Sequence, residues 1–102
     1  LASFETANVE SVSFEKGITK IPEYCMVGCR KLTEIIIPET VTEIGEYAFW
    51  GCSELNSVTI PDSVILIADT GFDVRDNLYM YVIGDSYAEK YALQKGIPYS
   101  VN

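Results

Sequence analysis

The stretch LTEIIIPETVTEIGEYAFWGCSEL, residues 32–55, is followed directly by a related one, LNSVTIPDSVILIADTGFDVRDNL, residues 55–78. Equivalent positions in the two stretches lie 23 residues apart. Three columns of mostly apolar residues keep this step: Leu32, Leu55 and Leu78; Ile35, Val58 and Tyr81; Phe14, Ile37, Ile60 and Ile83. Self-similarity at a period of about 20–50 residues is typical of solenoids, in which each coil packs only on its neighbours. The sequence therefore predicts a stack of similar coils.

Four coils are expected, at about residues 9–31, 32–54, 55–77 and 78–102. Each opens with alternating apolar residues, which indicate a short strand: ESVSF (10–14), TEIII (33–37), NSVTI (56–60) and YMYVI (79–83). Strands that recur once per coil stack in parallel, about 4.8 Å apart. We expect these side chains to face inward: Val12, Phe14, Ile35, Ile37, Val58, Ile60, Tyr81 and Ile83. The alternate positions form two outward ladders: Ser11, Glu34, Ser57 and Met80; Ser13, Ile36, Thr59 and Val82.

After each strand the chain is expected to turn and to bring a second apolar pair inward. Pro38 and Pro61 end the two middle strands, because proline has no amide hydrogen for a ladder bond. The second pair recurs at the same step: Ile18 and Ile21, Val41 and Ile44, Val64 and Ile67.

The related segments EYCMVGC (23–29) and EYAFWGC (46–52) come next. We expect each to form a single helical or 3₁₀ turn on the flank of the stack. In the second segment Ala48 and Phe49 would point into the core. The glycines Gly28 and Gly51 would end the turns in a left-handed conformation.

The end of the chain changes to a helical pattern. Ser86 and Glu89 have the spacing of a capping box, and Gly96 and Pro98 end the helix. A helix over residues 86–95 would cover the open apolar end of the last coil. The predicted divisions are a remnant of a preceding repeat at 1–8, repeat coils at 9–85 and a C-terminal cap at 86–102.

These columns resemble the BspA-like leucine-rich repeats, whose unit runs roughly L-x-x-I-x-I-P-x-x-V-x-x-I-G-x-x-A-F-x-x-C-x-x-L. One copy is matched at Leu32, Ile35, Ile37, Pro38, Val41, Ile44, Gly45, Ala48, Phe49, Cys52 and Leu55. The next is matched at Leu55, Val58, Ile60, Pro61, Val64, Ile67, Phe72 and Leu78. Departures stand at Pro22, Ala68, Gly71 and Arg75, and they affect the expected shape of single coils.

The resemblance implies an α/β leucine-rich-repeat solenoid of about four coils, with a stacked parallel sheet, short helical turns on the flank and a C-terminal capping helix. Members of the family are typically secreted or surface-anchored proteins of bacteria and protists, and several are linked to adhesion to host proteins. The resemblance therefore implies a secreted or cell-surface protein-interaction module. Its expected partner is a protein, with host surface or matrix proteins among the candidates.

Composition argues against several other classes of function. The net charge is −8 with seven basic residues, so neither nucleic acid nor an anionic membrane surface is an expected partner. No run approaches the roughly 20 apolar residues of a membrane span. The chain has no histidine, which removes Ser-His and Cys-His pairs and histidine metal sites. We therefore predict no catalysis and no cofactor.

The cysteines and the aligned acidic residues could form metal sites or a disulfide, but structural roles explain both sets better. Cys25, Cys29 and Cys52 lack an evident fourth zinc ligand, and we expect buried thiols that pack as small hydrophobes. A Cys29–Cys52 disulfide between coils stays open as the alternative. The repeat also aligns two acidic columns: Glu39, Asp62 and Asp85; Glu23, Glu46 and Asp69. Calcium would relieve their repulsion, but solvated turn residues are the favoured interpretation.

Two surfaces are candidate binding sites. The first is the outward strand face, the usual recognition face of solenoids: Glu34, Ile36, Ser57, Thr59, Met80 and Val82. The second is an aromatic cluster that would suit a carbohydrate or cell-wall ligand: Tyr24, Tyr47 and Trp50. A structural spacer that presents other domains is the remaining alternative. An unpaired strand near residues 9–14 would also favour self-association at that edge.

Overall fold

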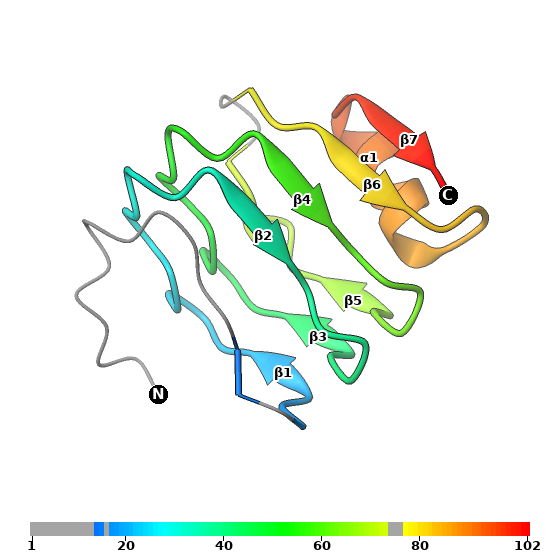
Figure 1. Cartoon of the computed structure of the whole chain (residues 1–102), viewed down its shortest axis with the longest axis horizontal. Helices are drawn as coiled ribbons and strands as arrows, with labels where there is room; N and C mark the ends of the chain where they lie inside the picture. The colour runs from blue at the N-terminus through cyan, green and yellow to red at the C-terminus, as the bar shows by residue number, and fades with distance from the viewer. Residues whose placement is uncertain (1–13, 16, 74–76) are drawn as a thin grey trace.

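Short parallel strands in two sheets make up most of the regular structure in the computed structural model, which describes residues 14–15, 17–73 and 77–102 (Figure 1). One sheet has the order β2-β4-β6-β7, from Glu34–Ile36, Ser57–Thr59, Met80–Val82 and Tyr99–Val101. The other has the order β1-β3-β5, from Lys20–Ile21, Glu43–Ile44 and Leu66–Ile67. Helix α1, Tyr87–Lys95, lies between β6 and β7 in the chain.

The sequence repeat sets the register of both sheets. Glu34 pairs with Ser57, and Lys20 pairs with Glu43, so each residue lies beside its equivalent 23 positions along. Just past the strands, the amide of Ile37 donates to the Thr59 carbonyl at 2.9 Å. The predicted parallel stacking is thus confirmed for the described repeats. The predicted strand at 10–14 (apart from its last residue), the remnant at 1–8 and the self-association edge lie outside the described residues.

The core is formed by side chains that point between the two sheets. They come from the same columns in each repeat, so like packs on like: Leu32 and Leu55; Ile35 and Val58; Ile37 and Ile60; Val41 and Val64; Ile21, Ile44 and Ile67. All of these are at most 3% exposed. Burial of such side chains, about 1.5–3 kcal/mol each, is what holds the repeats together.

The sequence did not predict the β1-β3-β5 sheet as a sheet. Its strands have two residues each, too few to show a period, and the apolar pairs there indicated only a turn inward. The backbone still runs beside its neighbour: Gly45 donates to the Ile21 carbonyl at 2.8 Å, and Ala68 donates to the Ile44 carbonyl at 2.9 Å. A buried backbone must pair its polar groups, and the neighbouring repeat supplies the partners.

The predicted helical turns on the flank are wrong. Tyr24 and Tyr47, at equivalent positions, have left-handed φ values of 61° and 57°, so a right-handed turn cannot pass through them. Instead the flank consists of hydrogen-bonded turns that bond across repeats: Met26 N to Ala48 O at 2.7 Å, and Gly28 N to Trp50 O at 2.8 Å.

Other predictions for the flank are confirmed. Gly28 and Gly51 have left-handed φ values of 75° and 78°. Ala48 and Phe49 are buried, and the Phe49 ring stacks on Phe72 of the next repeat with centroids 5.1 Å apart.

The prediction for the strand at 79–83 is wrong by one residue. Val58 pairs with Met80, a step of 22, so Met80 and Val82 are fully buried while Tyr81 and Ile83 are exposed. A shift of one residue sends every side chain of a strand to the opposite face. The inward orientation of methionine and valine leaves the tyrosine hydroxyl in solvent, where it needs no buried partner.

The C-terminal helix forms with the predicted capping box. The Ser86 hydroxyl accepts from the Glu89 amide, the Glu89 carboxylate accepts from the Asp85 amide, and Gly96 ends the helix at φ 73°. Helix α1 contacts β5, β6 and β7, with Ala88, Tyr91 and Ala92 buried. Strand β7 beyond it was not predicted; it pairs with β6 at the end of the sheet (Figure 1).

Gly45 is required by the close approach of two repeats. A Cβ atom there would lie 2.7 Å from the Glu23 amide nitrogen and 3.0 Å from the Ile21 carbonyl oxygen, both backbone atoms. We expect Gly45→Ala to lower the free energy of unfolding by about 1–3 kcal/mol, because the repeats must move apart. Urea titration followed by tryptophan fluorescence measures this. Exposed Glu54→Ala is the control, and an equal midpoint for both variants would contradict the packing argument.

The raised pKa of the buried Tyr91 hydroxyl predicts that the folded protein loses stability at alkaline pH. Burial, as the largest cause, raises the pKa of this hydroxyl from 10 to about 12. The folded protein therefore keeps this proton between pH 10 and 12 while the unfolded chain loses it. Stability present below pH 10 should fall toward pH 12 by up to about 1.4 kcal/mol per unit. Urea midpoints across this range should decline less steeply for Tyr91→Phe. Parallel declines would exclude the buried hydroxyl as the cause.

Candidate functional site

The outward face of the β2-β4-β6-β7 sheet is the first candidate site. The pairing places Ile36, Thr59, Tyr81 and Ser100 in one row across the four strands. Ile36 is 60% exposed and Tyr81 is 38% exposed. Packing of the core does not require a large apolar side chain at either position. We call this surface the strand face.

A second row lies beside the first, nearer the start of each strand. It contains Glu34, which is exposed, and Ser57, which is half-buried. Tyr79 continues it just before β6: its hydroxyl bonds to that of Ser100, and its ring lies 5.2 Å from the Tyr81 ring. This tyrosine pair makes one end of the strand face aromatic.

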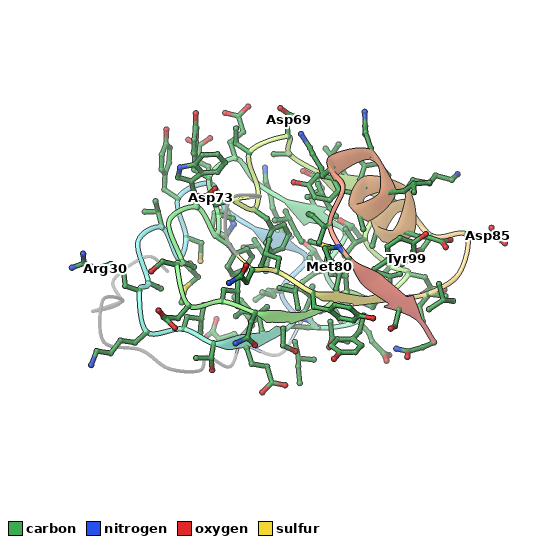
Figure 2. The ribbon with its side chains drawn as sticks, turned by 90° about the horizontal axis from the view of Figure 1, so that it is seen from above. Arg30, Asp69, Asp73, Met80, Asp85 and Tyr99 are labelled. Atoms are coloured by element: carbon green, nitrogen blue, oxygen red, sulfur yellow. The ribbon has the colours of Figure 1, made fainter. Side chains whose placement is uncertain are left out.

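Four of the six residues predicted for this face are on it: Glu34, Ile36, Ser57 and Thr59. The other two are corrected, because Met80 and Val82 are buried under the sheet, and Figure 2 labels Met80 among the interior side chains. Tyr79 and Tyr81 take their place and were missed. The alternation of tyrosine with methionine and valine in YMYV carried that signal, since the hydroxyl-bearing residues are the better outward set.

A groove of about 470 Å³ continues the strand face at the carboxyl ends of the strands. Ile36, Thr59 and Ile83 belong to its wall, together with Pro38 and Pro61 from the turns that follow β2 and β4. Two carboxylates, those of Glu39 and Asp62, stand at the same turns. The groove is therefore apolar with an acidic rim.

The predicted aromatic cluster is brought together on the flank. Tyr24 stacks on Tyr47 with ring centroids 5.4 Å apart and planes 12° from parallel, and Trp50 meets Tyr47 edge-on at 5.4 Å. Tyr24 is 54% exposed, and the other two are half-buried. The left-handed conformation of both tyrosines recurs at one position of the repeat, so it belongs to the repeat geometry. This cluster is the second candidate site.

The cysteines are placed inside. Cys25, Cys29 and Cys52 are all buried, and the Cys52 thiol donates to the Met26 carbonyl at 3.2 Å. Burial, reinforced by Cys29, raises the pKa of the Cys25 thiol, which keeps it protonated and unreactive near neutral pH. The predicted burial of the three thiols is therefore confirmed.

Among the described residues, no group of three or more acidic, cysteine or histidine side chains is placed to hold a metal ion. None of the helices there is long and apolar enough to cross a bilayer. A second hollow of about 590 Å³ lies over the β1-β3-β5 sheet. Its exposed ion pair, Lys20 with Glu43 at 3.8 Å, contributes little to stability.

Comparison with known families identifies a repeat model over residues 2–95, described as BspA type leucine-rich repeat region (6 copies). The matched range includes β1 to β6, the groove turns and the aromatic cluster. No curated protein and no solved structure matches the chain.

The corrected register of β6 predicts opposite outcomes for neighbouring residues. We expect Met80→Ala to lower the free energy of unfolding by about 2–5 kcal/mol, since it opens a cavity in the core. Tyr81→Ala should cost about 1 kcal/mol or less, because that ring is partly solvated. Thermal and urea unfolding of the two variants measure these losses. A larger loss for Tyr81→Ala would return the strand to the register that the sequence period predicted.

Proposed function

Because the chain belongs to the BspA-type leucine-rich repeat family, we propose that it is a non-catalytic module that binds another protein through its strand face. The observation that carries the proposal is the exposure of Ile36 and Tyr81 in one row of that face. Large apolar side chains in the centre of a surface are the usual anchors of protein interfaces, aromatic ones above all.

The backbone of the strand face supports binding through side chains. Within the sheet, amides and carbonyls pair with the neighbouring repeat, as between Ile60 and Tyr81 at 2.9 Å. The face itself therefore offers apolar and hydroxyl groups, with Glu34 and the acidic rim beside them. Such a surface suits a protein better than a small anion.

The setting we propose is the outside of a cell. Proteins of this repeat type are typically secreted or held at the bacterial surface, which supports an adhesin-like role with a host surface or matrix protein as partner. In that setting the parallel stack would serve as a rigid support for the strand face.

A carbohydrate is the second candidate ligand, favoured by the aromatic cluster. Tyr24 exposes more than half of its surface beside two further rings, and aromatic faces stack on sugars. Trp50 reports directly on this site, because it touches Tyr47. A glycan panel that leaves tryptophan fluorescence unchanged would exclude this candidate.

The test of the strand face uses two double variants with matched losses of apolar surface. Ile36→Ser/Tyr81→Ser alters the strand face, and Ile65→Ser/Leu66→Ser alters exposed residues, 67% and 49%, at the other sheet. Affinities for a panel of purified matrix and serum proteins are measured by biolayer interferometry.

We expect the first variant to weaken binding at least about tenfold, as for loss of large anchoring side chains, and the second less than twofold. Equal affinities of both variants for every partner would contradict a role for the strand face.

A further inference from the structure

The groove beyond the strands has the chemistry to select what enters it. Its wall is formed by Ile36, Ile83 and the two prolines, and it opens onto the strand face through Ile36 and Thr59. An apolar side chain placed there would leave water for a largely apolar surface. The groove is thus a natural extension of the protein-binding surface.

Backbone amides at the groove already donate to neighbouring segments of the chain. Ile37 donates its amide to Thr59, Ile60 to Tyr81, and Asn102 to Val82, at 2.8–2.9 Å. These amides are therefore unavailable to a carboxylate or phosphate. Lysine and arginine are absent from the described residues that line the groove. The lining favours a ligand that is not anionic.

The fixed charges favour a cationic ligand. Glu39 and Asp62 are exposed on successive turns at the rim, one repeat apart. The described basic residues lie elsewhere: Lys20 on β1, Arg30 and Lys31 before β2, Lys90 and Lys95 on α1. Arg30 and Asp85 stand at opposite ends of the molecule in Figure 2, which shows how far the basic turn is from the turns that follow the strands. With a net charge of −8, the whole field adds to the local attraction.

We propose that this groove binds an apolar side chain of the protein partner, in an extended segment whose neighbouring Lys or Arg side chains pair with Glu39 and Asp62. Arginine suits such a pair, since its guanidinium bonds a carboxylate through two parallel hydrogen bonds. The inference rests on the proposed function, because the segment belongs to the partner that the strand face binds.

Three fluorescein-labelled peptides test the chemistry with the full chain. One carries Gly-Ser-Lys-Leu-Arg-Ser-Gly, the second replaces both basic residues with glutamate, and the third replaces leucine with serine. By fluorescence polarisation we expect the first to bind at least about tenfold more tightly than either of the others, and to weaken as salt is raised. Equal affinities for the three, or tighter binding of the acidic peptide, would overturn the proposal.

Two charge variants locate the binding. Glu39→Gln/Asp62→Asn and Glu46→Gln/Glu54→Gln change the net charge equally, but only the first pair lies at the groove. We expect the first variant to bind the basic peptide about three- to tenfold more weakly, since it loses two exposed ion pairs. The second variant should weaken binding less than twofold. Ile83→Ser should weaken it as well, without removing charge. Equal losses in the two charge variants would show attraction by net charge alone and overturn the groove.

The result also separates this inference from the function beneath it. If Ile36→Ser/Tyr81→Ser loses the protein partner while Glu39→Gln/Asp62→Asn and Ile83→Ser both keep it, the strand face stands and the groove is excluded. If Ile36→Ser/Tyr81→Ser keeps the partner, the proposed function fails, whatever the peptides do.

Discussion

Backbone hydrogen bonds between equivalent positions of neighbouring repeats are the constraint on which the rest depends. They occur on three sides of each repeat: from Ile37 to Thr59, from Gly45 to Ile21 and from Met26 to Ala48. Each repeat is too thin to pair its own backbone, so its neighbour completes it. Once these bonds fix the step, side chains of one column must stack, as the Phe49 and Phe72 rings do at 5.1 Å.

The same constraint explains the end of the chain. A last repeat would leave β6 unpaired on one side and its apolar interior open. Strand β7 supplies the pairing, through bonds such as Met80 N to Pro98 O at 3.0 Å, and α1 covers the interior with Ala88 and Tyr91. The exposed ion pair of Lys95 with Asp69 adds a contact between cap and repeat, but burial of the apolar face does most to hold α1 in place.

The 23-residue period in the sequence was sufficient to predict the columns and the parallel pairing, and the capping residues were sufficient to predict the helix. It failed at β6, where one residue fewer separates Leu78 from the first inward strand residue, and at the flank, where Tyr24 and Tyr47 leave the helical conformation that their segments suggest. In both places tertiary pairing overrides the local pattern. The two-residue strands were too short to carry any periodic signal, and strand β7 follows the helix, outside the 23-residue pattern.

The sequence predicted where the candidate site lies, on the outward face of the sheet, but not which side chains would define its chemistry. Inward positions such as Ile37 and Ile60 are set by packing and repeat closely, whereas Ile36, Thr59 and Tyr81 in the outward row are all different. Packing does not require an exposed isoleucine or tyrosine there, and each leaves apolar surface in water at about 25 cal/mol per Å². A partner that covers them recovers this free energy. The outward residues that the repeat leaves unspecified are therefore the ones through which we propose that the chain binds a partner.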